Sequence, residues 1–321
     1  MTATLALAGD TMLGRGVADA LLADPGRPLI APEVAARMAE ADACVLNLEC
    51  CISDRGARFP EPGKPFFFRA PPVAAGRLAE LGVTAVTLAN NHALDYGPIA
   101  LLDTLRHLAD AGIAAVGAGA DAQAARASLA IECGPMRLRL VAFSDHPAAY
   151  AAGPDEPGIA FADLRAELAE WVTAAARPGP DEAAVLVTPH WGPNMVAEPM
   201  PRVRRAAEAL LGAGATLVAG HSAHVFHGVA GRVLFDLGDF LDDYAVDQAL
   251  RNDLGLLWLV ELDEGGPRRI RALPLALDYC FTRQAARDEA DWIERRLAQL
   301  CAPFGTTVER AGDLVEVHPT R

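Results

Sequence analysis

The sequence predicts an α/β fold, in which short buried strands alternate with amphipathic helices. Apolar runs of about four to eight residues recur along the 321 residues, and segments with helical spacing of apolar residues separate them. Hydrophobic residues make up 52 % of the chain and charged residues 22 %, which is typical of a folded globular protein. We expect a main domain over residues 1–270 and a strand and helix appendage over residues 271–321 that packs on the same domain.

The apolar runs are rich in Val and Leu, which is typical of strands buried on both faces. The expected strands span Thr4–Ala8, Ala43–Leu48, Ala85–Ala89, Ala114–Gly117, Leu138–Phe143, Ala184–Thr188, Thr216–Ala219, Arg232–Leu237 and Leu256–Leu262. Helices are expected where apolar residues recur three or four positions apart, in two cases with a glycine as a stop. These helices span Pro72–Leu81, Pro98–Ala111, Phe161–Arg177, Pro201–Gly212 and Ala285–Leu300.

The chain carries a formal net charge of −14, from 28 Lys and Arg against 42 Asp and Glu. A protein that binds nucleic acid generally needs a basic face. The short clusters Arg202–Arg205 and Arg268–Arg271 are instead typical of solvated helix or hairpin surfaces. We therefore expect no nucleic-acid partner, and hydrolysis of a long nucleic acid is disfavoured.

The cysteines and the apolar segments are evidence on the cellular compartment of the protein. Six cysteines are scattered without a C-x-x-C spacing, which is typical of reduced, buried thiols in a cytosolic protein. The chain has no uninterrupted apolar stretch of about 20 residues, and Met1 leads into the first apolar run without the basic segment of a secretory signal. These features predict a cytoplasmic protein without a membrane partner, and they do not predict its oligomeric state.

Polar residues follow five of the expected strands at the point where each strand ends. In α/β sheets ligands bind beyond the carboxyl ends of strands, so we expect these side chains to meet in one site. Carboxylate, amide and imidazole groups are ligands of divalent metals, and the absence of cysteine among them argues against a structural zinc site. The candidates are Asp10, Glu49, Asn91, His92, His190, His221 and His224.

Each candidate also has a structural interpretation when it is taken alone. Asp10 could cap a helix, and Glu49 could form a salt bridge in a loop. Asn91 could occupy a turn, and His190 could be a hydrogen-bonded core histidine. Their common position at strand ends favours a metal site over these separate explanations.

Seven motifs, taken together and in order, resemble the CapA family of poly-γ-glutamate capsule-synthesis proteins. That family's fold is similar to the calcineurin-like metallophosphoesterases. The motifs cover about the first 240 residues, and the resemblance implies a four-layer α/β/β/α sandwich around two mixed sheets. They are GDTMLGR (9–15), NLECCIS (47–53), KPFFFRAPP (64–72), LANNHALDYG (88–97), PHWG (189–192), GHSAHVFHG (220–228) and LFDLGDF (234–240).

The resemblance implies a pair of divalent metal ions, Mn, Fe or Zn, with Glu49 as the carboxylate that bridges them. Asp10 and His224 are the implied ligands of the first ion. The implied ligands of the second ion are Asn91, His190 and His221. The sequence departs from the D-x-H motif of classical phosphoesterases, because Asp10-Thr11-Met12 lacks the histidine, and this predicts a weaker first metal site.

The resemblance also implies that His92 is the catalytic histidine that protonates a leaving oxygen, with Asp95 orienting its ring. Four further residues are expected to bind substrate. Arg69 and Lys64 could form an anion clamp, although a loop packed by aromatics with its charges in water is the simpler interpretation. The other two are His146, after a strand end, and Asp239, where the family usually has Asn.

These expectations predict a metal-dependent hydrolase with a dinuclear centre, which uses a metal-activated water to cleave a phosphoester or amide bond of a small anionic substrate. The alternative is a non-catalytic accessory protein of poly-γ-glutamate capsule biosynthesis that binds an anionic polymer.

Overall fold

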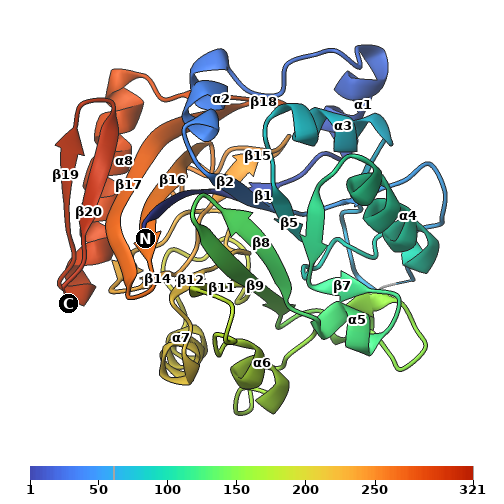
Figure 1. Ribbon diagram of the computed structural model, residues 1–321. Coiled ribbons are helices and arrows are strands. Elements are labelled where there is room, and N and C mark those ends of the chain that lie inside the picture. Colours follow the sequence, from blue (N-terminus) through green and yellow to red (C-terminus); the bar gives the residue numbers. More distant parts are fainter. Residues whose placement is uncertain (61, 321) are drawn as a thin grey trace.

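The computed structural model describes residues 1–60 and 62–320 and places two stacked β-sheets between two layers of helices (Figure 1). This arrangement confirms the predicted four-layer α/β/β/α sandwich.

The first sheet has ten strands in the described part of the chain, in the order β19-β20-β17-β16-β1-β2-β5-β6, with β15 paired to β1 and β18 paired to β17. Strands β1, β2, β5 and β6 run parallel, whereas β16, β17, β19 and β20 form antiparallel pairs. Their bounds are β1 (Ala3–Thr11), β2 (Ala43–Leu48), β5 (Ala85–Thr87), β6 (Ala114–Val116), β15 (Asp239–Leu241), β16 (Leu254–Asp263), β17 (Gly266–Asp278), β18 (Phe281–Gln284), β19 (Thr307–Ala311) and β20 (Leu314–His318).

The second sheet has the order β13-β14-β12-β11-β9-β8, and its strands β9, β11, β12 and β14 are parallel. Its strands are β8 (Leu129–Cys133), β9 (Met136–Ser144), β11 (Ala184–His190), β12 (Leu217–Ala219), β13 (Val229–Ala230) and β14 (Val233–Leu234). Two small pairs lie outside both sheets, β3 (Cys51–Ile52) with β4 (Arg69–Ala70) and β7 (Ala118–Gly119) with β10 (Gly158–Ile159).

Helices cover the outer faces of both sheets. The face of the first sheet packs on α1 (Arg15–Ala23), α2 (Pro32–Ala39), α3 (Val73–Glu80) and α4 (Gly97–Asp110). The face of the second sheet packs on α6 (Glu170–Ala175) and α7 (Pro201–Ala213), on the opposite side of the molecule in Figure 1. The remaining helices are α5 (Ala122–Arg126) and α8 (Arg287–Cys301).

Side chains of the first sheet pack into two apolar cores, one on each face of the sheet. In β1, Leu5 and Leu7 belong to the apolar layer between the sheets, whereas Ala6 and Ala8 face the helices. Successive residues of a strand point to opposite faces, so a continuous apolar run is needed where both faces are covered. The buried run at the start of the chain therefore forms a central strand.

The C-terminal segment continues the first sheet. The predicted boundary between residues 270 and 271 lies inside β17, which pairs with β16 on one side and β20 on the other. Strand β17 is not among the expected strands by its residue range, because three arginines interrupt the apolar pattern of its first half. Arg269 pairs with Glu316 and Arg271 with Glu261 on the neighbouring strands.

The helix predicted over Phe161–Arg177 is wrong for most of its length, because only Glu170–Ala175 is helical. The Asp163 carboxylate accepts hydrogen bonds from the backbone N–H of Arg165, at 2.9 Å, and from its guanidinium. Such local bonds favour a turn over a helix. The strand predicted over Arg232–Leu237 is likewise shorter, at Val233–Leu234.

Among the described residues, every helix is either too short or too polar to cross a bilayer.

We expect Leu186→Ala to lower the free energy of unfolding by about 2–5 kcal/mol, because Leu186 is fully buried between the two sheets. Urea unfolding followed by circular dichroism measures this. Leu22→Ala is the matched control, since Leu22 is 67 % exposed on α1 and should change stability little. Equal losses in both variants would contradict this account of the core.

Candidate metal centre

The carboxyl ends of parallel strands from both sheets meet at one place. Asp10 lies near the end of β1, and Glu49 follows β2 directly. His190 ends β11 and forms a parallel bridge with His221, which follows β12. The stacking of the sheets therefore brings together side chains that are far apart in the sequence, as the strand-end pattern predicts.

The described residues contain two groups of side chains that could each hold one cation. In each group the potential ligand atoms lie within 4.8 Å of one another: Asp10, Glu49 and His190 form the first, and Asp10, His224 and Asp239 form the second. Asp10 belongs to both. Asp239, which we expected to bind substrate, thus lies among the candidate metal ligands.

Several buried polar atoms in this centre have no hydrogen-bond partner in the described structure. Such atoms are rare in folded proteins, because each carries a desolvation cost. The His190 Nε2 atom is 3.8 Å from Glu49 Oε1, a separation that leaves no direct hydrogen bond. The unpartnered atoms are both carboxylate oxygens of Glu49, Asn91 Oδ1, His190 Nε2, His221 Nδ1 and Asp239 Oδ2. This mixture of carboxylate, amide and imidazole donors fits one or more divalent metal ions.

The pKa values of these groups shift as burial and their neighbours dictate. Burial and the adjacent Asp10 charge raise the pKa of Glu49 well above its usual range. Burial lowers the pKa of His190 well below its ordinary value. Burial opposes ionisation of Asp10, but the close approach of His221 Nδ1, 3.2 Å from Asp10 Oδ1, and the charges of the surrounding histidines hold the Asp10 pKa below its usual range. A neutral imidazole and a carboxylate are the forms in which these groups bind metal.

Asn47 positions Asp10, a role that we did not predict. The Asn47 Nδ2 group donates to Asp10 Oδ1 at 2.8 Å. The Asn47 Oδ1 atom accepts from Thr87 Oγ1 at 2.8 Å and from Asn90 Nδ2 at 3.0 Å. Asn47 therefore ties the ends of β1, β2 and β5 together. Its place in Asn47-Leu48-Glu49, at a predicted strand end, is the signal that could have found it.

His224 approaches the centre from a loop with an unusual backbone. Its Nδ1 atom lies 2.8 Å from Asp239 Oδ1 and 3.4 Å from Asp10 Oδ2. Ser222 and His224 have φ values of 109° and 59°, in the left-handed region that disfavours residues with a side chain. Backbone strain of this kind persists where the surroundings fix it, often at functional sites.

Asp236 holds this loop in place and was also not predicted. Its carboxylate is 1 % exposed and accepts hydrogen bonds from the backbone N–H groups of Ala223 and Gly238, each at 2.9 Å. The third histidine of the motif, His227, bonds outside the centre, because its Nε2–H group donates to the Val196 carbonyl at 2.9 Å.

Asp95 organises the predicted catalytic histidine. The His92 Nδ1 atom lies 2.6 Å from Asp95 Oδ2, and His92 Nε2 lies 3.9 Å from Glu49 Oε1. The same carboxylate accepts the backbone N–H of Phe68 at 2.6 Å and the Tyr150 hydroxyl at 3.0 Å. Lys64 Nζ completes the cluster at 2.8 Å from Asp95 Oδ1. Burial lowers the pKa of His92 to about 4, although Asp95 opposes this shift.

Lys64 and Arg69, the two residues of the predicted anion clamp, each contact internal partners in this structure. The Lys64 side chain is 10 % exposed. Its ammonium group forms an ion pair with the Asp95 carboxylate and donates a hydrogen bond to the Asn91 carbonyl. The Arg69 guanidinium stacks 4.1 Å above the Tyr96 ring and donates to the Arg55 carbonyl at 3.1 Å. The two cations thus serve different internal partners, because strand pairing of β3 with β4 turns Arg69 towards the loop at residue 55.

His146, a predicted substrate-binding residue, lies beside the centre. Its ring centroid is 5.3 Å from that of His190, and its Nδ1 atom is 2.5 Å from Asp145 Oδ1. It lines a cavity of about 600 Å³ together with Gly192 and Asn194.

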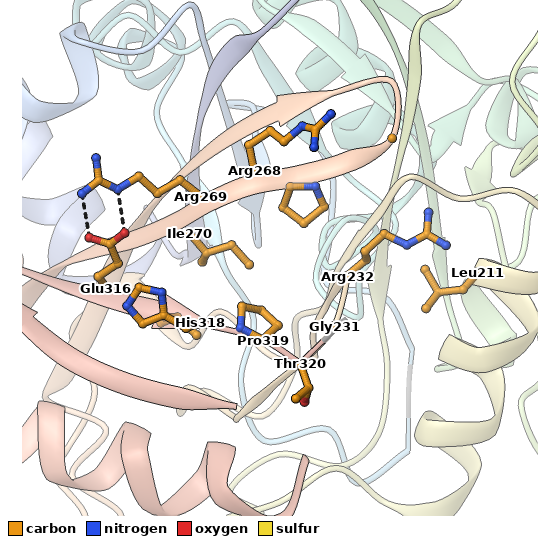
Figure 2. Close-up of a pocket in the computed structure, with 13 residues that line it drawn as sticks. Leu211, Gly231, Arg232, Arg268, Arg269, Ile270, Glu316, His318, Pro319 and Thr320 are labelled. Atoms are coloured by element: carbon orange, nitrogen blue, oxygen red, sulfur yellow. Dashed lines mark hydrogen bonds and ion pairs between the residues drawn. The ribbon is translucent and has the colours of Figure 1, made fainter. Parts of the chain in front are cut away.

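A second cavity, of about 520 Å³, lies between β17, β20 and the β13–β14 hairpin (Figure 2). Its lining includes none of the candidate metal ligands. Its arginines are held by the protein: Arg269 by Glu316, as Figure 2 shows, Arg268 by Asp263, and Arg232 by the Ala215 carbonyl. The centre around Asp10, and not this cavity, is therefore the candidate functional site.

We expect Glu49→Gln to stabilise the metal-free protein at neutral pH by about 1–3 kcal/mol, because it replaces a buried ionisable carboxyl beside the Asp10 charge with a neutral amide of the same shape. Because its pKa is raised, the Glu49 carboxyl stays protonated to a higher pH in the folded wild type than in the unfolded chain. The stability of the wild type should fall as the pH rises above about 4.5, and the variant should lack this contribution.

Urea unfolding in EDTA and in Mn²⁺ measures the effect. Added Mn²⁺ should stabilise the wild type more than the variant. Glu208→Gln, at an exposed position of α7, is the control and should change neither value. A metal-free Glu49→Gln protein that is less stable than the wild type would refute the assignment.

Comparison with known proteins supports the family resemblance and the fold. A family model described as "Bacterial capsule synthesis protein PGA_cap" matches residues 4–244. The chain is 32 % identical to a "Probable polyglutamine synthesis accessory protein" of Mycobacterium tuberculosis, covering 98 % of this chain and 96 % of the relative. It is 26 % identical to the capsule biosynthesis protein CapA of Bacillus anthracis, covering 83 % and 69 %.

Among solved structures, a phosphatase from Mycoplasma pneumoniae superposes with a TM-score of 0.50 at 13 % identity, covering 87 % of this chain and 95 % of that one. At this identity the likeness concerns the fold alone. The match over residues 4–244 and the seven motifs within it show that this chain belongs to the PGA_cap family of bacterial capsule synthesis proteins, the CapA family.

Proposed function

We propose that this protein is a divalent-metal-dependent hydrolase that cleaves a phosphoester or amide bond of a small anionic substrate. Glu49 carries the proposal. Both of its carboxylate oxygens are fully buried without a hydrogen-bond partner, within reach of His190 on one side and His92 on the other. A buried carboxylate in this state is costly unless a cation compensates it. A purely structural role leaves that cost unexplained.

The residues support a pair of ions that share Asp10. Asp10, Glu49 and His190 would hold one ion, with Asn91 Oδ1 and His221 as further donors. Asp10, His224 and Asp239 would hold the other. Asp239 would add a carboxylate to the first metal site, the one that contains His224. The sequence predicts that this site is the weaker one, because the histidine of the D-x-H motif is missing. Bound divalent ions in such a centre acidify a water molecule and polarise the bond under attack.

His92 is suited to move a proton at Nε2. Its Nδ1 atom donates to Asp95, which fixes the tautomer and leaves the Nε2 lone pair directed towards the centre. Because burial lowers its pKa to about 4, His92 is neutral at pH 7 and first accepts a proton from the attacking water. It then returns that proton to the leaving group. Lys64 and Tyr150 keep Asp95 in place for this role.

An accessory role without turnover is the second candidate, and one observation favours it. The relative from Mycobacterium tuberculosis carries the name of a synthesis accessory protein and aligns over nearly the whole chain. In that case the same centre would bind an anionic polymer such as poly-γ-glutamate without cleaving it. The two functions differ in turnover and not in metal content.

We expect purified protein to contain about two equivalents of Mn, Fe or Zn, and His190→Ala to lose at least one of them. Inductively coupled plasma mass spectrometry measures this. His227→Gln is a matched control, because His227 is buried nearby but bonds the Val196 carbonyl. Equal metal content in His190→Ala and wild type, or no binding after reconstitution, would refute the metal centre.

We expect His92→Ala to retain the metal content of the wild type but to lose turnover by about 10²–10⁴-fold. A screen with p-nitrophenyl phosphate and γ-glutamyl amides provides the assay. Asp95→Asn should lower turnover less than His92→Ala, since it only misorients the ring. Absence of turnover in metal-loaded wild type with every substrate would favour the accessory function.

A further inference from the structure

We infer that the cavity lined by His146 binds an oxyanion of the substrate and that Arg202 is the residue that determines specificity there. The inference rests on the proposed function, because it concerns the substrate of the same centre.

The cavity adjoins the metal centre on two sides. It has a volume of about 600 Å³, and His146 and Asn194 both line it. The His146 ring packs 5.3 Å from the His190 ring, and Asn194 Nδ2 lies 3.1 Å from His224 Nε2. One wall therefore contacts a candidate ligand from each metal group. The candidate ligands do not themselves line this cavity, but a molecule that fills it would be separated from His190 and His224 only by His146 and Asn194.

Two arginines line the cavity, and their surroundings differ. Arg165 is 80 % exposed and already holds a carboxylate, since its Nε and Nη2 atoms lie 2.9 Å and 2.7 Å from the oxygens of Asp163. Arg202 is 28 % exposed, and its nearest carboxylate oxygen, Asp145 Oδ2, is 3.6 Å from Nε. Its hydrogen bond in the described structure goes from Nη1 to the weakly accepting Met200 sulfur, at 3.1 Å.

Asp145 is held by other groups. Its two oxygens accept the backbone N–H of Gly192 at 3.2 Å each, and Oδ1 lies 2.5 Å from His146 Nδ1. The Arg202 guanidinium thus keeps donors for a further acceptor. It is also the second residue of α7, where the helix N-terminus adds positive potential. A planar guanidinium in this setting suits bidentate binding of an oxyanion.

The chemistry shared by the possible ligands is a compact oxyanion. It could be the phosphate of a phosphoester or a carboxylate of a γ-glutamyl chain, and the two correspond to the two bonds left open by the proposed function. A test that separates the two sources therefore also identifies the class of substrate.

Isothermal titration calorimetry with the full-length, metal-loaded protein provides the test. The probes are inorganic phosphate and tri-γ-glutamate. The variant is Arg202→Gln, and Arg205→Gln is the matched control. Arg205 is exposed on the same helix, carries the same charge and does not line the cavity. We expect Arg202→Gln to raise the Kd of at least one probe by about tenfold or more, and Arg205→Gln to leave both unchanged.

Each outcome decides the question. Arg202-dependent binding of phosphate alone favours a phosphoester substrate, and Arg202-dependent binding of tri-γ-glutamate alone favours a γ-glutamyl chain. Arg202-dependent binding of both probes supports the oxyanion site for either class. Equal Kd values in the two variants, or no binding of either probe to the wild type, overturns the inference. Thermal melts confirm that both variants are folded. Failure of the proposed hydrolase appears separately, as absence of turnover, because calorimetry records binding and not cleavage.

Discussion

The position of the Asp10 carboxylate is the constraint on which the rest of the site depends. Asp10 is fully buried at the end of a central strand of the first sheet. It accepts a hydrogen bond from Asn47 on the neighbouring strand and one from the backbone N–H of Ser222, at 3.2 Å, in the loop that follows β12 of the second sheet. The Asp10 carboxylate thus links a strand end of the first sheet to a loop that follows a strand of the second sheet. Loss of this group would separate the two halves of the centre.

The same arrangement explains why the centre suits cations. Carboxylates from Asp10, Glu49 and Asp239 are buried within one small volume, and each raises the cost of ionising its neighbours. Histidines compensate only part of that charge, because burial also keeps His190 neutral. A folded chain that keeps such a cluster is less stable than one with apolar residues there, so the cluster is best understood through binding.

The sequence predicted the parts of the structure that depend on local patterning. Apolar runs located the central strands, and the polar residues at their ends located Asp10, Glu49, His190 and His224. Contacts between residues that are far apart in the sequence could not be predicted. No local pattern shows that Lys64 reaches Asp95. The helix predicted before residue 170 is absent, because the Asp163 carboxylate accepts the backbone N–H of Arg165 and this local bond favours a turn. The role of Arg202 depends on the geometry of Asp145, which lies 57 positions earlier in the chain.

The central place of β1 has a consequence for how the protein folds. Strand β1 pairs on one side with β2 and on the other with β16, so that Leu5 lies opposite Val260. During synthesis the first of these partners is available early, whereas the second emerges only after most of the chain has been made. Contacts of such long sequence separation slow folding and leave apolar edges exposed meanwhile. The first strand therefore keeps one unpaired edge until β16 has been made.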